Sequence, residues 1–295
     1  MNGRRKFRLR LPGRTLALGE RTLVMGVVNV TPDSFSDGGL SLDPDAAAER
    51  ALELERAGAD IVDVGGESTR PGARPVPLEV ELDRVLPVLE KLCGRLRVPI
   101  SIDTSKAKVA DLAAAAGAEI LNDVTALAGD PAMGEVARRR RLAVILMHIR
   151  GRPRSMQRGP FARNALADVR RGLAAAARRA RGAGLGRDRI LLDPGIGFGK
   201  NYRQNFELLA QLPALGRLGF PLVVGPSRKA FIGAALGGAE PAARAWGTAA
   251  AATAAVLGGA HIVRVHDVSE MAQVVRVADA MFDAGARISH FRRTR

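Results

Sequence analysis

Eight short apolar runs, each followed by a longer segment with helical spacing, recur along this sequence of 295 residues. The runs fall at 23–28, 61–64, 99–102, 119–121, 143–147, 190–192, 222–224 and 262–265. They are mostly β-branched or aliphatic, which is typical of strands that are buried on both faces. Such strands occur in parallel sheets covered by helices, so this alternation constrains the fold more than any other feature of the chain.

Start and stop signals mark the segments between the runs as helices. Asp43 and Pro44 supply an N-cap and a first-turn proline, and Gly58 ends that helix. The next helix, 78–89, keeps its apolar residues at three-four spacing, and Pro87 predicts a kink in it. Further helices are expected at 105–117, 131–141, 161–184, 202–218, 241–258 and 268–285.

Eight strand–helix units favour a closed (β/α)₈ TIM barrel, an α/β fold of roughly 250 residues. The alternative is an open doubly wound sheet. Ahead of the barrel, apolar residues at positions 7, 9 and 11 alternate with arginines, and Pro12 and Gly13 turn the chain, so 1–20 is predicted to form an N-terminal β-hairpin. No shift of composition and no flexible linker divides 1–295, which predicts a single domain.

The chain is strongly basic, with 45 Lys and Arg against 30 Asp and Glu and a formal net charge of +15. A surplus of this size makes nucleic-acid binding a hypothesis to weigh. Aromatic residues make up only 4% and do not interleave with the basic clusters, so a base-stacking surface is not expected. The clusters are mostly arginines on Ala-rich segments, which is typical of solvated helix faces. A second interpretation is attraction of small anionic substrates.

Several classes of protein are excluded by what the sequence lacks. The single Cys93 excludes an internal disulfide framework and a multi-cysteine zinc site, and the histidines lack the spacing of a zinc motif. No run of about 18 apolar residues is present, and the basic start of the chain lacks the apolar stretch of a signal peptide. We therefore expect a cytoplasmic protein with no membrane partner.

A polar or ionisable residue lies at or just past the end of every apolar run. In chain order these residues are Asn29, Asp63, Asp103, Asn122-Asp123, His148, Asp193, Ser227-Arg228-Lys229 and His266. In a barrel the carboxyl ends of all strands meet at one face, where active sites of this fold lie. Any one of these residues could be a helix cap, but caps do not require Asn, His and Arg-Lys where they occur here.

The strand-end residues indicate a particular chemistry. Asp103, Asn122 and Asp193 can accept hydrogen bonds from the N–H groups of a planar, nitrogen-rich ring. The cations after the seventh and eighth runs occupy the usual anion site of this fold. Met147 and Phe198 are either core residues or a stacking wall for a flat ligand. Long loops at 29–40 and 65–77 favour a mobile lid.

Seven motifs in chain order resemble those of the bacterial dihydropteroate synthases, pterin-binding (β/α)₈ enzymes. They are MGVVNVTPDSFSDGG at 25–39, DVGGESTRPGA at 63–73, SIDTSK at 101–106, NDV at 122–124, DPGIGFGK at 193–200, GPSRKAFIG at 225–233 and RVHDV at 264–268. The resemblance implies a condensation of 6-hydroxymethyl-7,8-dihydropterin diphosphate with p-aminobenzoate in folate biosynthesis. It also implies SN1-like departure of diphosphate assisted by Mg²⁺.

The resemblance further implies roles for individual residues. The catalytic groups would be Asp103, Lys229, Arg264 and His266, the last two binding the diphosphate. The pterin would be held by Asp103, Asn122, Asp193 and Lys229. Met147, Phe198 and Gly225 are further expected substrate-binding residues. The p-aminobenzoate site would be formed by Phe35, Thr69, Arg70, Pro71 and Ser227. Asn29 would reach the diphosphate through Mg²⁺, a hard ion that prefers oxygen ligands.

The expected partners are therefore the two small substrates and no nucleic acid. The family also implies a homodimer, with the Ala-rich helices of 241–285 as candidates for its interface. Two alternatives stay open: a pterin-binding methyltransferase or inactive pterin-binding paralogue, and a basic nucleic-acid-binding protein. Methyltransferases of this kind are not expected to carry the ESTRPG and SRK loops together.

Overall fold

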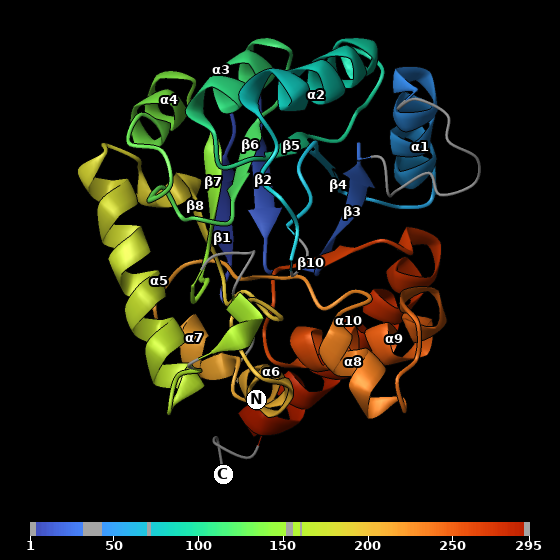
Figure 1. Ribbon diagram of the computed structural model, residues 1–295. Helices are drawn as coiled ribbons and strands as arrows, with labels where there is room; N and C mark the ends of the chain where they lie inside the picture. The colour runs from blue at the N-terminus through green and yellow to red at the C-terminus, as the bar shows by residue number, and fades with distance from the viewer. Residues whose placement is uncertain (1–3, 32–42, 70–71, 152–155, 160, 292–295) are drawn as a thin grey trace.

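The barrel predicted from the sequence is present in the computed structural model, which describes residues 4–31, 43–69, 72–151, 156–159 and 161–291 (Figure 1). Its strands are β3 (Leu23–Asn29), β4 (Ile61–Gly65), β5 (Ile100–Asp103), β6 (Ile120–Asp123), β7 (Ala143–Met147), β8 (Ile190–Asp193), β9 (Val223–Val224) and β10 (Ile262–Val265). All neighbours pair in parallel, in the order β8-β7-β6-β5-β4-β3-β10-β9.

The two ends of this sheet meet, so the barrel is nearly closed. Leu192 of β8 forms a parallel bridge with Leu222, next to β9, and the Leu192 amide donates to the Pro221 carbonyl over 3.0 Å. Closure leaves the sheet almost without free edges, and it rules out the open doubly wound alternative.

Helices cover the outside of the barrel (Figure 1). They are α1 (Pro44–Arg56), α2 (Leu78–Leu92), α3 (Ala107–Ala115), α4 (Met133–Arg139), α5 (Ala165–Gly182), α6 (Tyr202–Ala210), α7 (Pro213–Gly216), α8 (Ala230–Ala235), α9 (Ala245–Leu257) and α10 (Val268–Phe291). Asp43 caps α1 as predicted, accepting from the Asp45 amide over 2.9 Å. Apolar residues of the helices and the outer strand faces form the main core.

The helices differ from the predictions at four points. The helix expected at 202–218 is broken into α6 and α7, because Pro213 lacks the N–H and the space to continue α6. A short helix, α8, precedes α9 where no helix was predicted. The helix expected from 161 begins at Ala165, because Asn164 caps it by accepting from the Ala167 amide over 2.9 Å. The helix with Pro87, α2, continues past its predicted end to Leu92.

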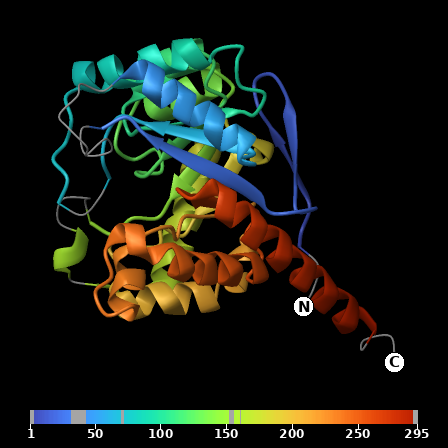
Figure 2. The same ribbon diagram turned by 90° about the vertical axis from the view of Figure 1, so that its right-hand side faces the viewer.

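The predicted N-terminal hairpin closes the amino-terminal end of the barrel. It pairs β1 (Phe7–Arg10) with β2 (Thr15–Leu18), and Figure 2 shows it on the side away from the loops that follow the strands. Leu9 and Leu18 are buried against apolar residues inside the barrel, such as Ile61 and Ile262. The opposite end of the barrel is therefore the end available for a ligand.

Among the described residues, no helix is both long and apolar enough to cross a membrane.

Candidate active site

The inward-facing side chains of the barrel change from apolar to polar along the strands. Side chains alternate between the two faces of a strand, so residues two apart both point inward. The lower inward layer contains Ile61, Ile120, Leu191 and Ile262. Two residues further along the same strands, the upper layer contains Asp63, Asn122, Asp193 and Arg264. The polar layer lies at the carboxyl end, as predicted.

Arg264 spans the mouth of the barrel. Its Nε donates to Oδ2 of Asp63 over 2.6 Å, and its Nη2 donates to Oδ2 of Asp103 over 2.9 Å. Asn122 Nδ2 donates to the same Asp63 oxygen over 3.1 Å. One guanidinium therefore joins β10 to β4 and β5 in a buried network. Charge-assisted bonds of this kind are stronger than neutral ones and hold the side chains in fixed positions.

Burial alters the acidity of two carboxyl groups in this layer. It raises the pKa of Asp103 to about 7, although Arg264 opposes the shift, and nearby Asp63 adds to it. Burial also raises the pKa of Asp193, against the effect of the Gly195 amide, which donates to Asp193 Oδ1 over 2.6 Å. Strongly shifted carboxyl groups in a cavity are typical of functional sites.

A small cavity brings most of the predicted pterin residues together. Its lining includes Thr69, Asp103, Asn122, Val124, Met147, Asp193, Gly195, Ile196, Phe198, Gly225, Lys229 and Arg264. Met147 and Phe198 line it from β7 and the loop after β8, and they pack in a small cluster with Val124. Lys229 Nζ lies 4.1 Å from the Phe198 ring centroid, a cation–π contact. A flat ring would thus have an apolar wall on one side and hydrogen-bonding groups at its edge.

The segment after β9 and the end of β10 place His266 against Ser227. His266 Nδ1 lies 2.9 Å from Ser227 Oγ. Burial, together with Arg264 and Arg228, lowers the pKa of His266 to about 3. His266 is therefore neutral near pH 7 when no anion is bound, and its ring can donate a hydrogen bond to an anionic group. Arg228 is paired with Asp267 through Nε at 3.1 Å and through Nη2.

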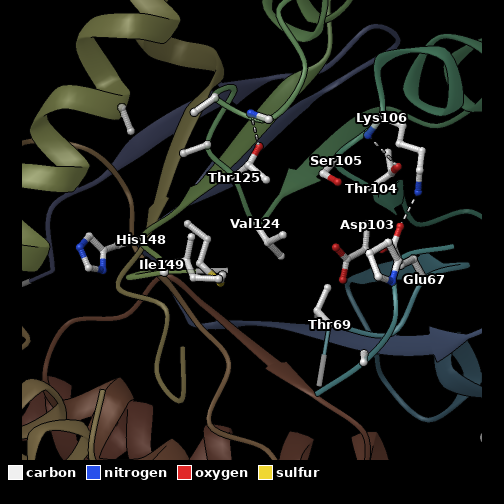
Figure 3. A pocket seen from close by; sticks show the side chains of 18 of the residues that line it. Glu67, Thr69, Asp103, Thr104, Ser105, Lys106, Val124, Thr125, His148 and Ile149 are labelled. Carbon is white, nitrogen blue, oxygen red and sulfur yellow. Dashed lines mark hydrogen bonds and ion pairs between the residues drawn. The ribbon is translucent and has the colours of Figure 1, made fainter. Parts of the chain in front are cut away.

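A larger cavity, about 950 Å³ in volume, lies beside the small one (Figure 3). The two share Thr69, Asp103, Val124 and Met147. At one wall of the larger cavity, Lys106 Nζ donates to both Glu67 and Glu81. Glu81 is fully buried on α2, so this ammonium ties the loop after β4 to the helical layer.

The remaining predicted residues have different outcomes. Asn29 is half-buried at the end of β3. Phe35, Arg70 and Pro71 lie outside the described residues. Asp63 lies within the apolar run 61–64, and no individual role was predicted for it from sequence. Its position two residues after the inward Ile61 is the signal that places it in the inward polar layer. No group of three or more His, Cys, Asp or Glu that could hold a metal occurs in the part of the chain that the structure describes.

A nearly closed parallel barrel with buried charged and polar side chains at its carboxyl end is the arrangement of a barrel enzyme with its active site at that end. The family model described as "Pterin binding enzyme" matches residues 25–266, and the chain belongs to this family. Within it, the chain groups with the dihydropteroate synthases. It is 48% identical over 264 residues to the dihydropteroate synthase of Synechocystis sp., covering 90% of this chain and 91% of the relative.

Solved structures agree with this placement. The Yersinia pestis dihydropteroate synthase in a sulfonamide drug complex superposes with a TM-score of 0.88 at 44% identity, covering 93% of this chain and 99% of that one. The Xanthomonas albilineans dihydropteroate synthase with 4-aminobenzoic acid gives a TM-score of 0.87 at 44% identity, covering 94% and 98%.

Proposed function

We propose that this protein is a transferase that condenses 6-hydroxymethyl-7,8-dihydropterin diphosphate with p-aminobenzoate, forming 7,8-dihydropteroate and diphosphate in folate biosynthesis. One observation carries the proposal: Asp103, Asn122 and Asp193 converge on a cavity walled by Phe198 and bordered by Lys229. The likeness to the Xanthomonas albilineans enzyme, solved with 4-aminobenzoic acid, supports the second substrate.

The edge of the pterin ring matches the polar groups of the cavity. A pterin presents N–H and NH₂ donors together with ring acceptors. Asp193 and Asp103 would accept from those donors, and Asn122 can both donate and accept. Met147 and Phe198 would contact one face of the ring, and Gly225 leaves room because it has no side chain. Lys229, beside Phe198, would donate to an acceptor of the ring.

The reaction then proceeds by charge separation. The C–O bond between the exocyclic methylene and the diphosphate breaks, and its electron pair leaves on the diphosphate. The cation formed at the methylene is delocalised into the pterin, and the Asp103 carboxylate would stabilise it. The amine nitrogen of p-aminobenzoate attacks the methylene and then loses a proton, which restores neutrality. No strong base is needed for this step.

The leaving diphosphate would be bound at the β10 side of the mouth. Arg264 would contribute charge and neutral His266 would donate a hydrogen bond. Asn29 offers a single amide oxygen at the end of β3, so a Mg²⁺ ion here would be held mainly by diphosphate and water oxygens, which suits that ion. When bound, Mg²⁺ supplies neutralisation of the charge that develops on the leaving group.

The p-aminobenzoate site would adjoin the pterin cavity. Thr69 lines both cavities, and Ser227 is held by His266. Phe35, Arg70 and Pro71 are proposed for this site on the resemblance of their motifs alone.

A turnover assay tests the proposal and separates it from its alternatives. Purified protein is incubated with pterin diphosphate, p-aminobenzoate and Mg²⁺, and both diphosphate and dihydropteroate are measured. We expect release of both in equal amounts and only with p-aminobenzoate present. Binding of pterin without turnover would indicate an inactive paralogue. A steep salt-dependent affinity for random duplex DNA would instead support the nucleic-acid alternative.

We also propose that the protein is a homodimer and that it works in the cytoplasm. Large exposed apolar side chains gather on and beside the C-terminal helices, where Trp246 on α9 is 86% exposed. Others are Val277 and Met281 on α10, Phe206 on α6 and Leu236 at the end of α8, and both α6 and α8 contact α9. Exposed apolar patches often mark protein interfaces. Analytical ultracentrifugation of the protein and of Trp246→Lys tests this, with a dimer expected for the first and dissociation for the second.

The free thiol of Cys93 suits a reducing compartment, and cell fractionation tests the location.

A further inference from the structure

Lys200 is a buried lysine with no place in the proposed reaction. It ends the motif 193–200 after β8, and only 3% of it is exposed. Its Nζ lies 2.8 Å from the His148 carbonyl, 2.8 Å from the Gly195 carbonyl and 3.0 Å from His148 Nδ1. Each N–H of the ammonium therefore has an acceptor. An ammonium can only donate, so His148 Nδ1 accepts and the imidazole proton sits on Nε2, facing Asp168 Oδ2 at 3.6 Å.

The electrostatics agree with this arrangement. Burial, with a further effect of Lys200, lowers the pKa of His148 to about 3, so the ring is neutral and Nδ1 is free to accept. Burial lowers the pKa of Lys200 to about 7, while Asp193 and Asp168 oppose that shift and Lys229 adds to it. Burial thus works against the charge on Lys200, whereas its three acceptors and the carboxylates of Asp193 and Asp168 favour the protonated form.

The loop after β8 lies directly on the backbone beyond β7. Gly195 and Gly199 have φ of +65° and +67°, in the left-handed region that favours glycine. A Cβ on Gly195 would overlap the His148 carbonyl oxygen, and one on Gly199 would overlap the Arg150 carbonyl oxygen. Lys200 bonds to a carbonyl on each side of this contact, so it joins the two segments where they touch.

The same loop carries the pterin-facing groups. The Gly195 amide holds Asp193 Oδ1 at 2.6 Å, and the Phe198 amide donates to the Gly195 carbonyl over 3.0 Å. That carbonyl is also an acceptor of Lys200. Lys200 itself is not among the residues that line the small cavity. Its influence on a ligand must therefore pass through the position of the loop.

We propose that Lys200 is a positioning residue of the pterin site, which clamps the loop after β8 to the end of β7 and so orients Asp193 and Phe198 toward the ring. This inference rests on the proposed function. Replacing the ammonium by an apolar group leaves buried acceptors without donors, which is costly. An amide at this position retains two N–H donors and can satisfy both carbonyls, so glutamine should rescue part of the effect.

Calorimetric binding of pterin diphosphate alone tests the clamp. We compare Lys200→Met and Lys200→Gln with Lys108→Met, which makes the same chemical change at an exposed position. For Lys200→Met we expect a Kd raised on the order of tenfold, with a smaller rise for Lys200→Gln and none for Lys108→Met. The KM for p-aminobenzoate at saturating pterin should change much less. A Lys200→Met protein with wild-type pterin affinity, or with both substrates weakened equally, would overturn the proposal.

A second pair of variants leaves every charge in place and guards against a failure of Lys200→Met to fold. A Cβ on Gly172 of α5 would overlap Cδ2 of His148, whereas a Cβ on Gly182 of the same helix meets nothing within 4 Å. Both glycines can become alanine, a better helix former. We expect Gly172→Ala to raise the pterin Kd by about threefold or more and Gly182→Ala to leave it unchanged. Equal pterin affinity in the two variants would refute the clamp. If wild-type protein neither bound pterin nor turned over, the proposed function would fail instead.

Discussion

Arg264 and Asp63 form a buried ion pair across the mouth of the barrel, with 2.6 Å between Nε and Oδ2 and no exposed surface on the Asp63 side chain. The residues come from β10 and β4, which are separated in the sheet by β3. Asp63 also accepts from Asn122, and its Oδ1 has no hydrogen-bond partner among the described residues. The pair thus fixes the orientation of Arg264 at the mouth, from a carboxylate that is itself fully buried.

We expect Asp63→Asn to destabilise the protein and to weaken pterin binding. Removing one partner of a buried pair leaves the Arg264 charge with Asp103 alone, and breaking such pairs costs about 3 kcal/mol or more. Urea unfolding of the variant measures the loss. Arg50→Gln breaks a pair that is exposed on both sides and should change stability by less than about 1 kcal/mol. Similar losses in both variants would contradict a special role for the buried pair.

Asp103 should make activity depend on pH near neutrality. Its pKa is raised to about 7, mainly by burial, so below that value the group is protonated and can no longer stabilise a cation. We expect kcat/KM to rise with pH through about 7. Asp103→Asn should lower kcat/KM by about 100-fold to 1,000-fold and remove this limb of the profile. A rising limb that persists in the variant would come from another ionisable group, such as Asp193, whose pKa is also raised, or the substrate diphosphate. An unchanged profile would remove Asp103 from the mechanism.

Lys106 should matter more for stability than its partner Glu67. Burial lowers the pKa of Lys106, but hydrogen bonds to Glu67 and Glu81 raise this pKa by more. Lys106 therefore stays charged. Lys106→Met leaves Glu81 buried without a cation and should cost about 3 kcal/mol or more. Glu67→Gln keeps the Lys106–Glu81 pair and should cost about 1 kcal/mol or less. Thermal unfolding compares the two, and a larger loss for Glu67→Gln would reverse this assignment.

His261 should contribute to acid sensitivity. It accepts from the Leu222 amide at Nδ1 over 3.1 Å, and its Nε2 lies 2.9 Å from the Arg5 carbonyl, so it is buried and neutral. Burial lowers its pKa to about 4 from 6.5, although the Arg5 contact opposes the shift. Between those values the unfolded chain binds more protons, so lowering the pH removes stability.

The size of this effect follows from the shift. His261 should contribute a slope of about 1.4 kcal/mol per pH unit between roughly pH 6 and pH 4.5. Unfolding free energies of His261→Gln and wild type, measured across this range, isolate the contribution because all other titrating groups are shared. Parallel curves for the two proteins would show that His261 does not titrate as described.

The alternation of strands and helices could be predicted from the sequence, because it depends on periodicity and capping signals within a few residues of each other. The same local logic located the strand-end residues, including Asp103, Asn122 and Asp193. It failed at two places. The apolar spacing of 202–218 continues across Pro213 and hides the break that this proline makes, and the six residues of α8 are too few to show a helical period.

The contacts at the barrel mouth depend on which strands become neighbours when the barrel closes. Arg264 lies 201 positions from Asp63 and 161 from Asp103, and Lys200 lies 52 from His148. No local pattern specifies such pairs, because they depend on strand order, register and the stagger that closure imposes. The sequence by itself determined the kind of barrel and the chemical groups at its mouth. Only the tertiary structure decided that Arg264 bonds to two carboxylates, that His266 is buried and neutral, and that Lys200 holds the loop after β8.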